Sequence, residues 1–185
     1  MSHIIVLTGS PSARSRTAAL SDLIAQRLET AGHIVATVRV RDLPAQALIE
    51  ADAAHPAIAE TVAAIEAADG LVVASPVYKA AYSGVLKTLL DLLPQRALSG
   101  KAVLPVITGG TAAHLLAIDY ALRPVLVSLG AHHVAKGCFV LDQHITLSPG
   151  DGAAALGPES AEQLHAAVDG FAAVLDTRRP LVPAC

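Results

Sequence analysis

Short apolar runs alternate along this chain with longer segments in which apolar residues recur every three or four positions. Apolar runs of about 4–8 residues are typical of buried strands, and the longer spacing is typical of helices that cover a sheet. The pattern predicts strands at residues 4–8, 34–40, 71–75, 103–108 and 137–141. Strands that alternate with helices in this way form a parallel sheet.

Helices are expected between and after these strands. The first carries Leu20, Leu23, Ile24 and Leu28 on one side and ends at Gly32, a residue type favoured where a helix stops. The others are predicted at residues 57–68, opened by Pro56, at 83–93, capped by Ser83, at 112–129 and at 158–177.

This order of elements predicts an α/β fold: a flavodoxin-like doubly wound five-stranded parallel sheet, strand order 2-1-3-4-5, with helices on both faces. A length of 185 residues suits one domain. We expect this domain at residues 1–177 and a loose C-terminal tail at 178–185. In such a topology, ligands bind beyond the carboxyl ends of the strands.

Composition and charge narrow the class of protein. Hydrophobic residues make up 53% and charged residues 16%, which excludes an intrinsically disordered chain. A net charge of −3 argues against nucleic acid as the main partner. The two cysteines give no disulfide framework, no apolar run reaches the length of a membrane span, and no signal peptide is recognisable. We therefore expect a cytoplasmic protein without a membrane partner.

The loop after the first strand reads Thr8-Gly9-Ser10-Pro11-Ser12-Ala13-Arg14-Ser15-Arg16-Thr17. The loop carries hydroxyls and backbone amides and leads into the amino end of a helix. This arrangement is a suitable site for a phosphate group. The hydroxyls of Ser10, Ser15 and Thr17 and the guanidinium of Arg16 or Arg14 are the candidate ligands. The alternative is an ordinary helix cap with two solvated arginines. The loop lacks GxGxxG and GxxxxGK[ST], which disfavours a classical dinucleotide fold and a P-loop NTPase.

Two further loops follow neighbouring strands. Ser75-Pro76-Val77-Tyr78-Lys79 and Gly109-Gly110-Thr111 offer exposed backbone that can lie beside a planar ring, although each is equally compatible with an ordinary tight turn. Because all three loops end adjacent strands, they predict one phosphate site and two walls that face a ring. A mononucleotide with a flat heterocycle fits this arrangement.

Pro124 interrupts the helix expected at 112–129. Proline has no N–H for the carbonyl of Tyr120, and its ring crowds that carbonyl, so the helix is expected to distort there. Such a position favours a one-residue π-bulge, a feature often found at functional sites. The alternative is a proline-kinked core helix that carries one amphipathic tyrosine.

These segments resemble the NAD(P)H-dependent FMN reductases, above all the members that supply reduced flavin to alkanesulfonate monooxygenases. The likeness rests on Gly9-Ser10-Pro11, Ser15-Arg16-Thr17, residues 75–84, 87–94 and 108–111, and His114-Leu115-Leu116-Ala117. It implies that Ser10, Ser15, Arg16 and Thr17 hold the FMN phosphate. It implies that Pro76, Val77, Tyr78, Lys79, Gly109, Gly110 and Thr111 flank the isoalloxazine. Ser12-Ala13-Arg14 departs from any fixed family string, which leaves the role of Arg14 open.

Residues 117–122 are similar to the family segment in which an inserted tyrosine makes a π-helix at the subunit interface, near the flavin. Tyr120 is accordingly the candidate for the interface and for flavin exchange. The resemblance implies a homo-oligomer, a tetramer or a dimer, and implies that FMN comes and goes as a substrate.

The resulting hypothesis is a flavoprotein oxidoreductase in which NADPH or NADH reduces FMN. Hydride transfer between two stacked rings needs no protein acid or base, so no catalytic residue is assigned. By the resemblance, reduced FMN then leaves for the monooxygenase of a two-component system in sulfur metabolism. The alternatives are a quinone or azo reductase of the same fold with permanently bound FMN, a flavodoxin-like electron carrier without catalysis, and a regulatory domain.

The remaining polar residues suggest little further chemistry. His132-His133, His144 and Cys138 match no zinc spacing, so no metal is assigned. Arg39 and Arg41 alternate with Val38 and Val40, as expected for the polar side of an edge strand, with recognition of the NADPH 2′-phosphate as the alternative role.

Overall fold

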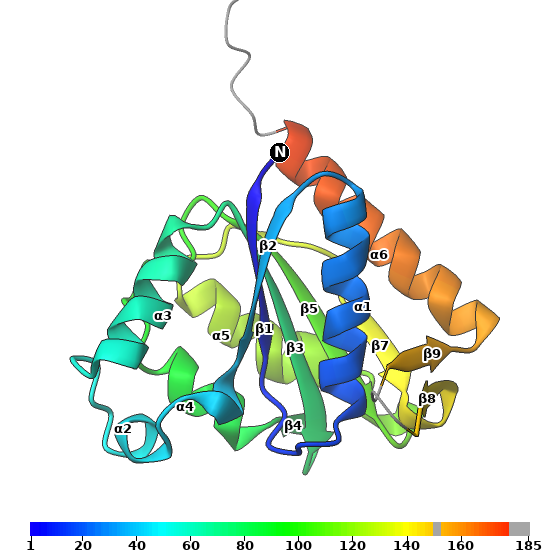
Figure 1. Cartoon of the computed structure of the whole chain (residues 1–185), viewed down its shortest axis with the longest axis horizontal. Coiled ribbons are helices and arrows are strands. Elements are labelled where there is room, and N and C mark those ends of the chain that lie inside the picture. Colours follow the sequence, from blue (N-terminus) through cyan, green and yellow to red (C-terminus); the bar gives the residue numbers. More distant parts are fainter. Residues whose placement is uncertain (150–152, 178–185) are drawn as a thin grey trace, which may run out of the picture.

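A parallel sheet forms the centre of the computed structural model, which describes residues 1–149 and 153–177. The main strands are β2 (Ile34–Arg39), β1 (His3–Thr8), β3 (Gly70–Tyr78) and β5 (Ala102–Gly109), side by side in that order. β6 (His133–Val134) and β7 (Cys138–Leu141) both pair with β5 in parallel. The predicted order 2-1-3-4-5 is confirmed, with β7 as the fifth strand (Figure 1). The predicted tail at 178–185 lies outside the described residues.

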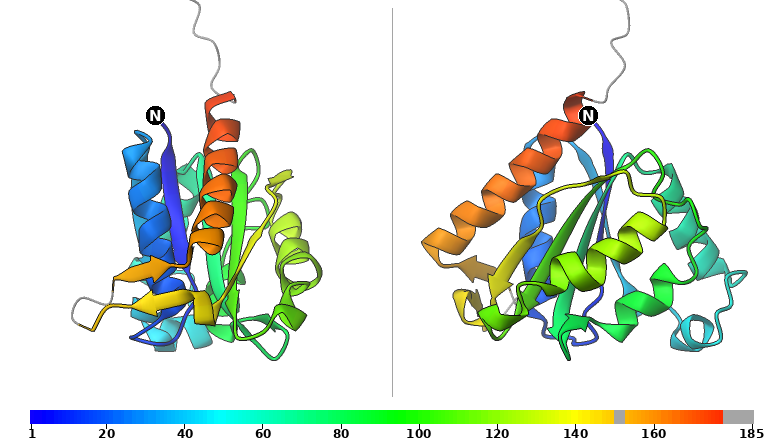
Figure 2. Two further views of the ribbon diagram at one scale, coloured as in Figure 1. Left: turned by 90° about the vertical axis from the view of Figure 1, so that its right-hand side faces the viewer. Right: turned by 180° about the vertical axis from the view of Figure 1, so that it is seen from behind.

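Helices cover both faces of this sheet (Figure 2). One face packs against α1 (Arg16–Thr30) and α6 (Pro158–Thr177), and its core is centred on Leu20, Ile24 and Phe171. The opposite face packs against α3 (Pro56–Ala67), α4 (Gly84–Leu90) and α5 (Arg123–Ser128). Alternating side chains of the buried strands enter the two cores, so the continuous apolar runs seen in the sequence are explained by burial on both sides.

The helix ends follow local signals. Ser15 caps α1, and Gly32, with φ of 87°, follows its last turn. Pro56 occupies the first position of α3, and the Ser83 hydroxyl accepts a hydrogen bond from Leu86 N at 3.1 Å to cap α4. The helix predicted at 83–93 ends earlier, at Leu90, because the chain tightens into turns before Pro94.

The helix expected at 112–129 is divided into three parts, and the distortion expected at Tyr120 is present as a π-helical turn. The segment consists of a 3₁₀ turn, η2 (Ala112–His114), a π-helical turn, η3 (Ile118–Leu122), and then α5. In the π-helical turn the N–H of Arg123 donates to the carbonyl of Ile118, five residues back. Pro124 then stands in the first turn of α5, where its missing N–H costs nothing. The proline thus separates two helices at the predicted place.

Several short elements complete the chain. They are 3₁₀ turns η1 (Val40–Asp42) and η4 (Asp142–His144), helix α2 (Ala45–Ile49), and strands β4 (Ala81–Tyr82), β8 (Ile145–Leu147) and β9 (Ala154–Leu156). β4 forms a hairpin with the end of β3, and β8 pairs with β9 in a separate small sheet. Among the described residues, no helix is long and apolar enough to cross a membrane.

Candidate functional site

Three connecting segments meet at the carboxyl edge of the sheet. They are the loop from β1 to α1, which we call the phosphate loop (residues 9–15), the β3–β4 hairpin, and the loop from β5 to η2. Register places the ends of their strands side by side: Thr8 pairs with Ala74, and Pro76 pairs with Thr108. The site residues expected from the sequence are therefore brought to one edge of the sheet (Figure 1).

The phosphate loop presents donors at the amino end of α1. Ser10 and Ser15 are buried, and Ser15 Oγ accepts from Ala18 N at 3.1 Å. The first backbone N–H groups of a helix, here those of Arg16 and Thr17, have no partner within the helix. These donors and the positive end of the helix dipole suit a phosphate group, so the residues present fit the anionic end of FMN.

Buried hydroxyls support this loop from below. Thr8 Oγ1 donates to Ser21 Oγ at 2.7 Å, and Ser21 Oγ donates to the carbonyl of Thr17 at 2.9 Å. Thr17 Oγ1 lies 2.6 Å from Thr108 Oγ1, which joins α1 to the end of β5. The hydroxyl of Thr17 is therefore engaged in the interior, and its backbone N–H is the group that remains for a phosphate.

Arg16 is exposed and forms a long-range contact. Its Nε donates to the carbonyl of Ile145 at 3.2 Å, which ties the first turn of α1 to β8. Ile145 is buried, so this contact fixes the guanidinium near the loop. The remaining guanidinium N–H groups can meet a phosphate without breaking the bond from Nε. Arg14 is exposed on the outer side of the same loop.

The hydroxyl and the backbone N–H of Ser83 together join three neighbouring segments. Ser83 Oγ donates to the carbonyl of Gly9, and the N–H of Ser83 donates to Ser75 Oγ at 2.9 Å. Gly9 packs so closely on α4 that a Cβ there would overlap the Cβ of Leu86. The phosphate loop, the end of β3 and the start of α4 are thus locked together. The sequence predicts the capping role of Ser83 but not its bond to Gly9, because the two residues are far apart along the chain.

The β3–β4 hairpin carries the first wall for a ring. Val77 pairs with Tyr82 and Tyr78 with Ala81, which leaves Lys79 and Ala80 in the turn. Both have positive φ, 51° for Lys79 and 64° for Ala80, a conformation that costs about 1 kcal/mol or more for a residue with a side chain. Such a turn matches the twist of the strands, so the hairpin is held beyond the sheet edge.

The second wall is built on Gly109, Gly110 and Thr111. A Cβ on Gly109 would lie 3.0 Å from the ring of Phe139, so a larger residue would displace the neighbouring strand. Gly110 is exposed, and a Cβ there would lie 3.9 Å from a carboxylate oxygen of Asp142. Thr111 Oγ1 accepts from Ala113 N at 3.3 Å and caps η2. The exposed backbone at Gly110 is free of side-chain cover, as a planar ligand requires.

Tyr82 and Lys87, near the hairpin wall, both have a raised pKa. Burial raises the pKa of the Tyr82 hydroxyl, and nearby Lys87 only partly opposes that effect. The hydrogen bond from Lys87 Nζ to Asp91, 2.6 Å long, raises the pKa of Lys87. Burial lowers the pKa of Lys101, but that ammonium binds the carbonyls of Glu66 and Ala68 at the opposite edge of the sheet. The raised pKa values keep the Tyr82 hydroxyl protonated and the Lys87 ammonium charged at neutral pH.

Tyr120 lies on the π-helical turn and is 80% exposed. The turn packs against β4, so it adjoins the hairpin wall. Arg123 fixes the turn from its other side: its Nε donates to Asp119 at 2.8 Å and its Nη1 to the carbonyl of Val134 at 3.0 Å. The side chain of Tyr120 thus projects outward from a braced position next to the candidate site.

Comparisons with known proteins identify several related chains. The family model described as NADPH-dependent FMN reductase matches residues 2–146. The FMN reductase (NADPH) of Pseudomonas putida is 44% identical over 181 residues, which cover 97% of this chain and 92% of the relative. The FMN reductase (NADPH) of Escherichia coli K12 is 47% identical and covers 77% and 75% of the two chains.

Two further matches are named as enzymes that use NADH. The NADH-dependent FMN reductase SfnF of Pseudomonas putida is 35% identical and covers 80% of this chain and 83% of the relative. The apo form of NADH:FMN oxidoreductase EMOB superimposes with a TM-score of 0.85, at 40% identity and with full coverage of both chains.

Proposed function

The chain belongs to the NADPH-dependent FMN reductase family, and from that premise we propose that it reduces FMN for release to a separate flavin-dependent monooxygenase. It is an oxidoreductase of a family that uses NADPH or NADH with FMN. The further proposal concerns three points: which residues bind FMN, whether FMN leaves after reduction, and which enzyme receives it.

Two groups of residues at the carboxyl edge bind different parts of FMN in this proposal. FMN, when bound, supplies an N5 atom that accepts hydride from nicotinamide C4. Ser10, Ser15 and the backbone N–H groups of Arg16 and Thr17 hold the phosphate, with the Arg16 guanidinium beside them. Pro76, Val77, Tyr78 and Lys79 on one side, and Gly109, Gly110 and Thr111 on the other, flank the ring. The protein contributes orientation and exclusion of water from the stacked rings.

The observation that carries the release of FMN is the exposed Tyr120 on a π-helical turn beside the ring wall. This turn coincides with the segment that resembles the sulfonate-linked reductases. We propose that Tyr120 contributes to a subunit interface next to the flavin and to flavin exchange. Alkanesulfonate desulfonation in sulfur acquisition is the setting that the resemblance favours.

Exposed apolar side chains support self-association on this side of the molecule. Leu115, Leu116, Tyr120 and Val127 are each more than half exposed and lie on the segment from η2 to α5. Exposed apolar residues gathered on one segment favour an interface. A homo-oligomer, a dimer or a tetramer, would cover them. Sedimentation equilibrium of the wild type and of a variant that lacks Tyr120 measures the assembly directly.

Absorbance and NADPH oxidation test the proposal. The purified protein is expected to be colourless and to oxidise NADPH only when FMN is added. A protein that stays yellow through dialysis and reduces quinones would instead be an FMN-prosthetic reductase. A flavin-binding protein that oxidises neither NADPH nor NADH would be an electron carrier, and the proposal would be withdrawn.

A further inference from the structure

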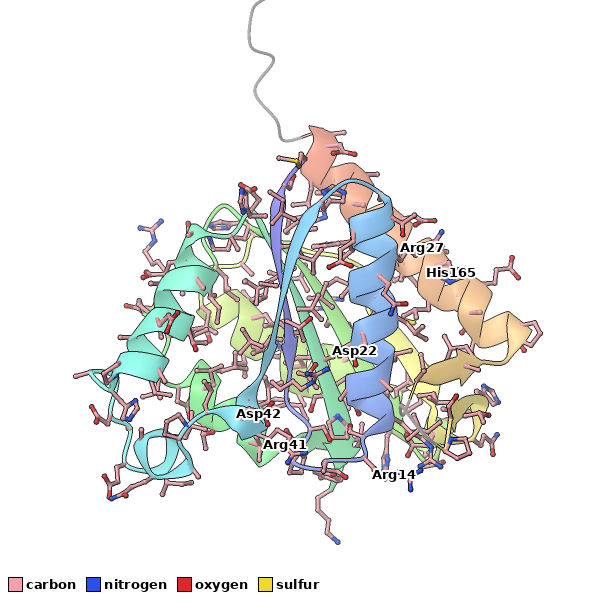
Figure 3. All side chains as sticks on the ribbon, viewed as in Figure 1. Arg14, Asp22, Arg27, Arg41, Asp42 and His165 are labelled. Carbon is pink, nitrogen blue, oxygen red and sulfur yellow. The ribbon has the colours of Figure 1, made fainter. Side chains whose placement is uncertain are left out.

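A cationic hollow adjoins the phosphate loop on its β2 side. It has a volume of about 250 Å³ and is lined by Ser10 and Ser12 of the loop, by Arg39 of β2, and by Arg41 and Asp42 of η1. A second hollow of about 340 Å³ lies along α1 and also reaches Arg39, with Arg14 and Asp22 in its lining. Figure 3 shows Arg14, Arg41 and Asp42 at this carboxyl edge, with Asp22 further along α1.

The guanidinium groups are only partly satisfied by the two carboxylates. Arg39 donates to both oxygens of Asp22, at 2.7 and 3.0 Å, through Nη2 alone, and its Nε and Nη1 make no hydrogen bond to the described residues. The Nε of Arg41 lies 3.5 Å from Asp42, beyond a good hydrogen bond. Because Arg14 adds a third cation to two anions, the hollows keep a net positive charge.

The strand order fixes where this charge lies relative to the ring walls. β2 flanks β1 on one side, and β3 and β5, which carry the ring walls, follow on the other. Neighbouring strands are about 4.8 Å apart, so β2 and β5 are separated by roughly 14 Å. If the nicotinamide lies over the ring between the walls, a dinucleotide that extends past the phosphate loop would bring its adenosine end to the hollow beside Arg41.

We propose that Arg39 and Arg41 bind the 2′-phosphate of NADPH and thereby set the preference for NADPH over NADH. This inference rests on the proposed function, because it presumes that a nicotinamide dinucleotide is the reductant. A phosphate monoester carries close to two negative charges, which two guanidinium groups can match with charge-assisted hydrogen bonds. NADH has a hydroxyl in that position and gains nothing from them.

Steady-state kinetics of three single variants test the assignment. Arg41→Ala and Arg39→Ala are each expected to raise the KM for NADPH by about tenfold, as for the loss of a charged hydrogen bond. The KM for NADH and the KM for FMN should each change less than about twofold. Arg27→Ala is the control: it removes a guanidinium of similar exposure from α1, where Arg27 binds Asp169 at 2.6 Å, far from this edge (Figure 3).

Two outcomes of these kinetics overturn the inference. An equal loss for NADPH and NADH would assign the arginines to the shared part of the dinucleotide. A rise in the KM for FMN alone would assign them to the FMN phosphate. Thermal denaturation of each variant, expected within a few degrees of the wild type, shows that the fold is retained.

Calorimetry separates the inference from the proposed function. Adenosine 2′,5′-bisphosphate should bind the wild type at least about tenfold more tightly than 5′-AMP, and Arg41→Ala should remove that difference. Equal binding of the two nucleotides to the wild type refutes the inference even if FMN is reduced. Selective binding by a protein that reduces no FMN supports the arginine site and refutes the proposed function.

Discussion

The phosphate loop and the β3–β4 hairpin lie at the same edge of the sheet but are held in place by different forces. Buried hydroxyls of Thr8, Thr17 and Ser21 support the loop, and Gly9 seats it against α4. The hairpin relies on two strand pairs and on a turn with positive φ at Lys79 and Ala80. We infer that the phosphate end of the ligand meets a rigid, preorganised site, whereas the ring end meets a hairpin whose turn carries backbone strain.

The largest expected effect comes from a variant that disrupts the close packing of the phosphate loop on α4. Gly9→Ala places a methyl group against the Cβ of Leu86, so the loop and α4 must separate. We expect a loss of about 3 kcal/mol in the free energy of unfolding and a large loss of FMN affinity. Urea denaturation and fluorescence titration with FMN measure the two effects.

Gly84 provides the matched control for that variant. A Cβ at Gly84 meets nothing within 4 Å, and the residue begins α4. Gly84→Ala should therefore leave stability unchanged or raise it slightly. Equal losses for the two alanine variants would show that the close packing of Gly9 is not what holds the loop.

The next effect concerns the hydroxyl pair beneath the loop. Thr17→Val leaves the buried hydroxyl of Thr108 without its partner, which should cost about 2 kcal/mol of unfolding free energy. The double variant Thr17→Val, Thr108→Val removes both hydroxyls and should recover most of that loss. A double-mutant cycle by chemical denaturation checks the pair, and additive losses would contradict it.

Arg16 tests whether the exposed part of the loop contributes to phosphate binding. Arg16→Ala should raise the Kd for FMN by about tenfold, with little change for riboflavin, which has no phosphate. Calorimetry with the two flavins separates a phosphate contact from the contact with Ile145. Parallel losses for FMN and riboflavin would assign Arg16 to support of β8 instead.

The smallest expected effect tests the strained turn of the β3–β4 hairpin. Ala80→Gly relieves the positive φ of 64° and should stabilise the protein by about 0.5–1 kcal/mol in urea denaturation. Ala81→Gly, in β4 and outside the positive-φ turn, should instead destabilise it. If both glycine variants destabilise the protein equally, the positive φ of Ala80 carries no cost in stability.

The sequence predicts most of the fold because its signals are local. Apolar runs locate the strands, Ser83 caps α4 as expected, and Pro124 marks the place where the helix after β5 is divided. The proline predicts a π-bulge, but the full division into a 3₁₀ turn, a π-helical turn and a short α-helix is not predictable from it alone. It depends also on Arg123, whose bonds to β6 and to the residue after it hold the distorted turn.

The candidate site is predicted less completely, because its contacts join distant segments. The three loops follow from the strand order, but nothing local indicates that the Thr17 hydroxyl turns inward to Thr108 or that Arg16 reaches Ile145. Likewise, the bond from Ser83 to Gly9 spans 74 positions along the chain. The binding roles of the individual residues await the experiments above.

The bonds of Ser83 have a consequence for how a ligand would leave. Because its hydroxyl bonds to Gly9 of the phosphate loop and to the first turn of α4, and its N–H bonds to Ser75 at the end of β3, we expect these parts to move together. Under the proposal that FMN leaves after reduction, we expect its exit to begin at the loop from β5 to η2, where Gly110 is exposed and Thr111 Oγ1 caps the following 3₁₀ turn. We expect the loop from β5 to η2 to move while the phosphate loop, the end of β3 and the start of α4 stay in place.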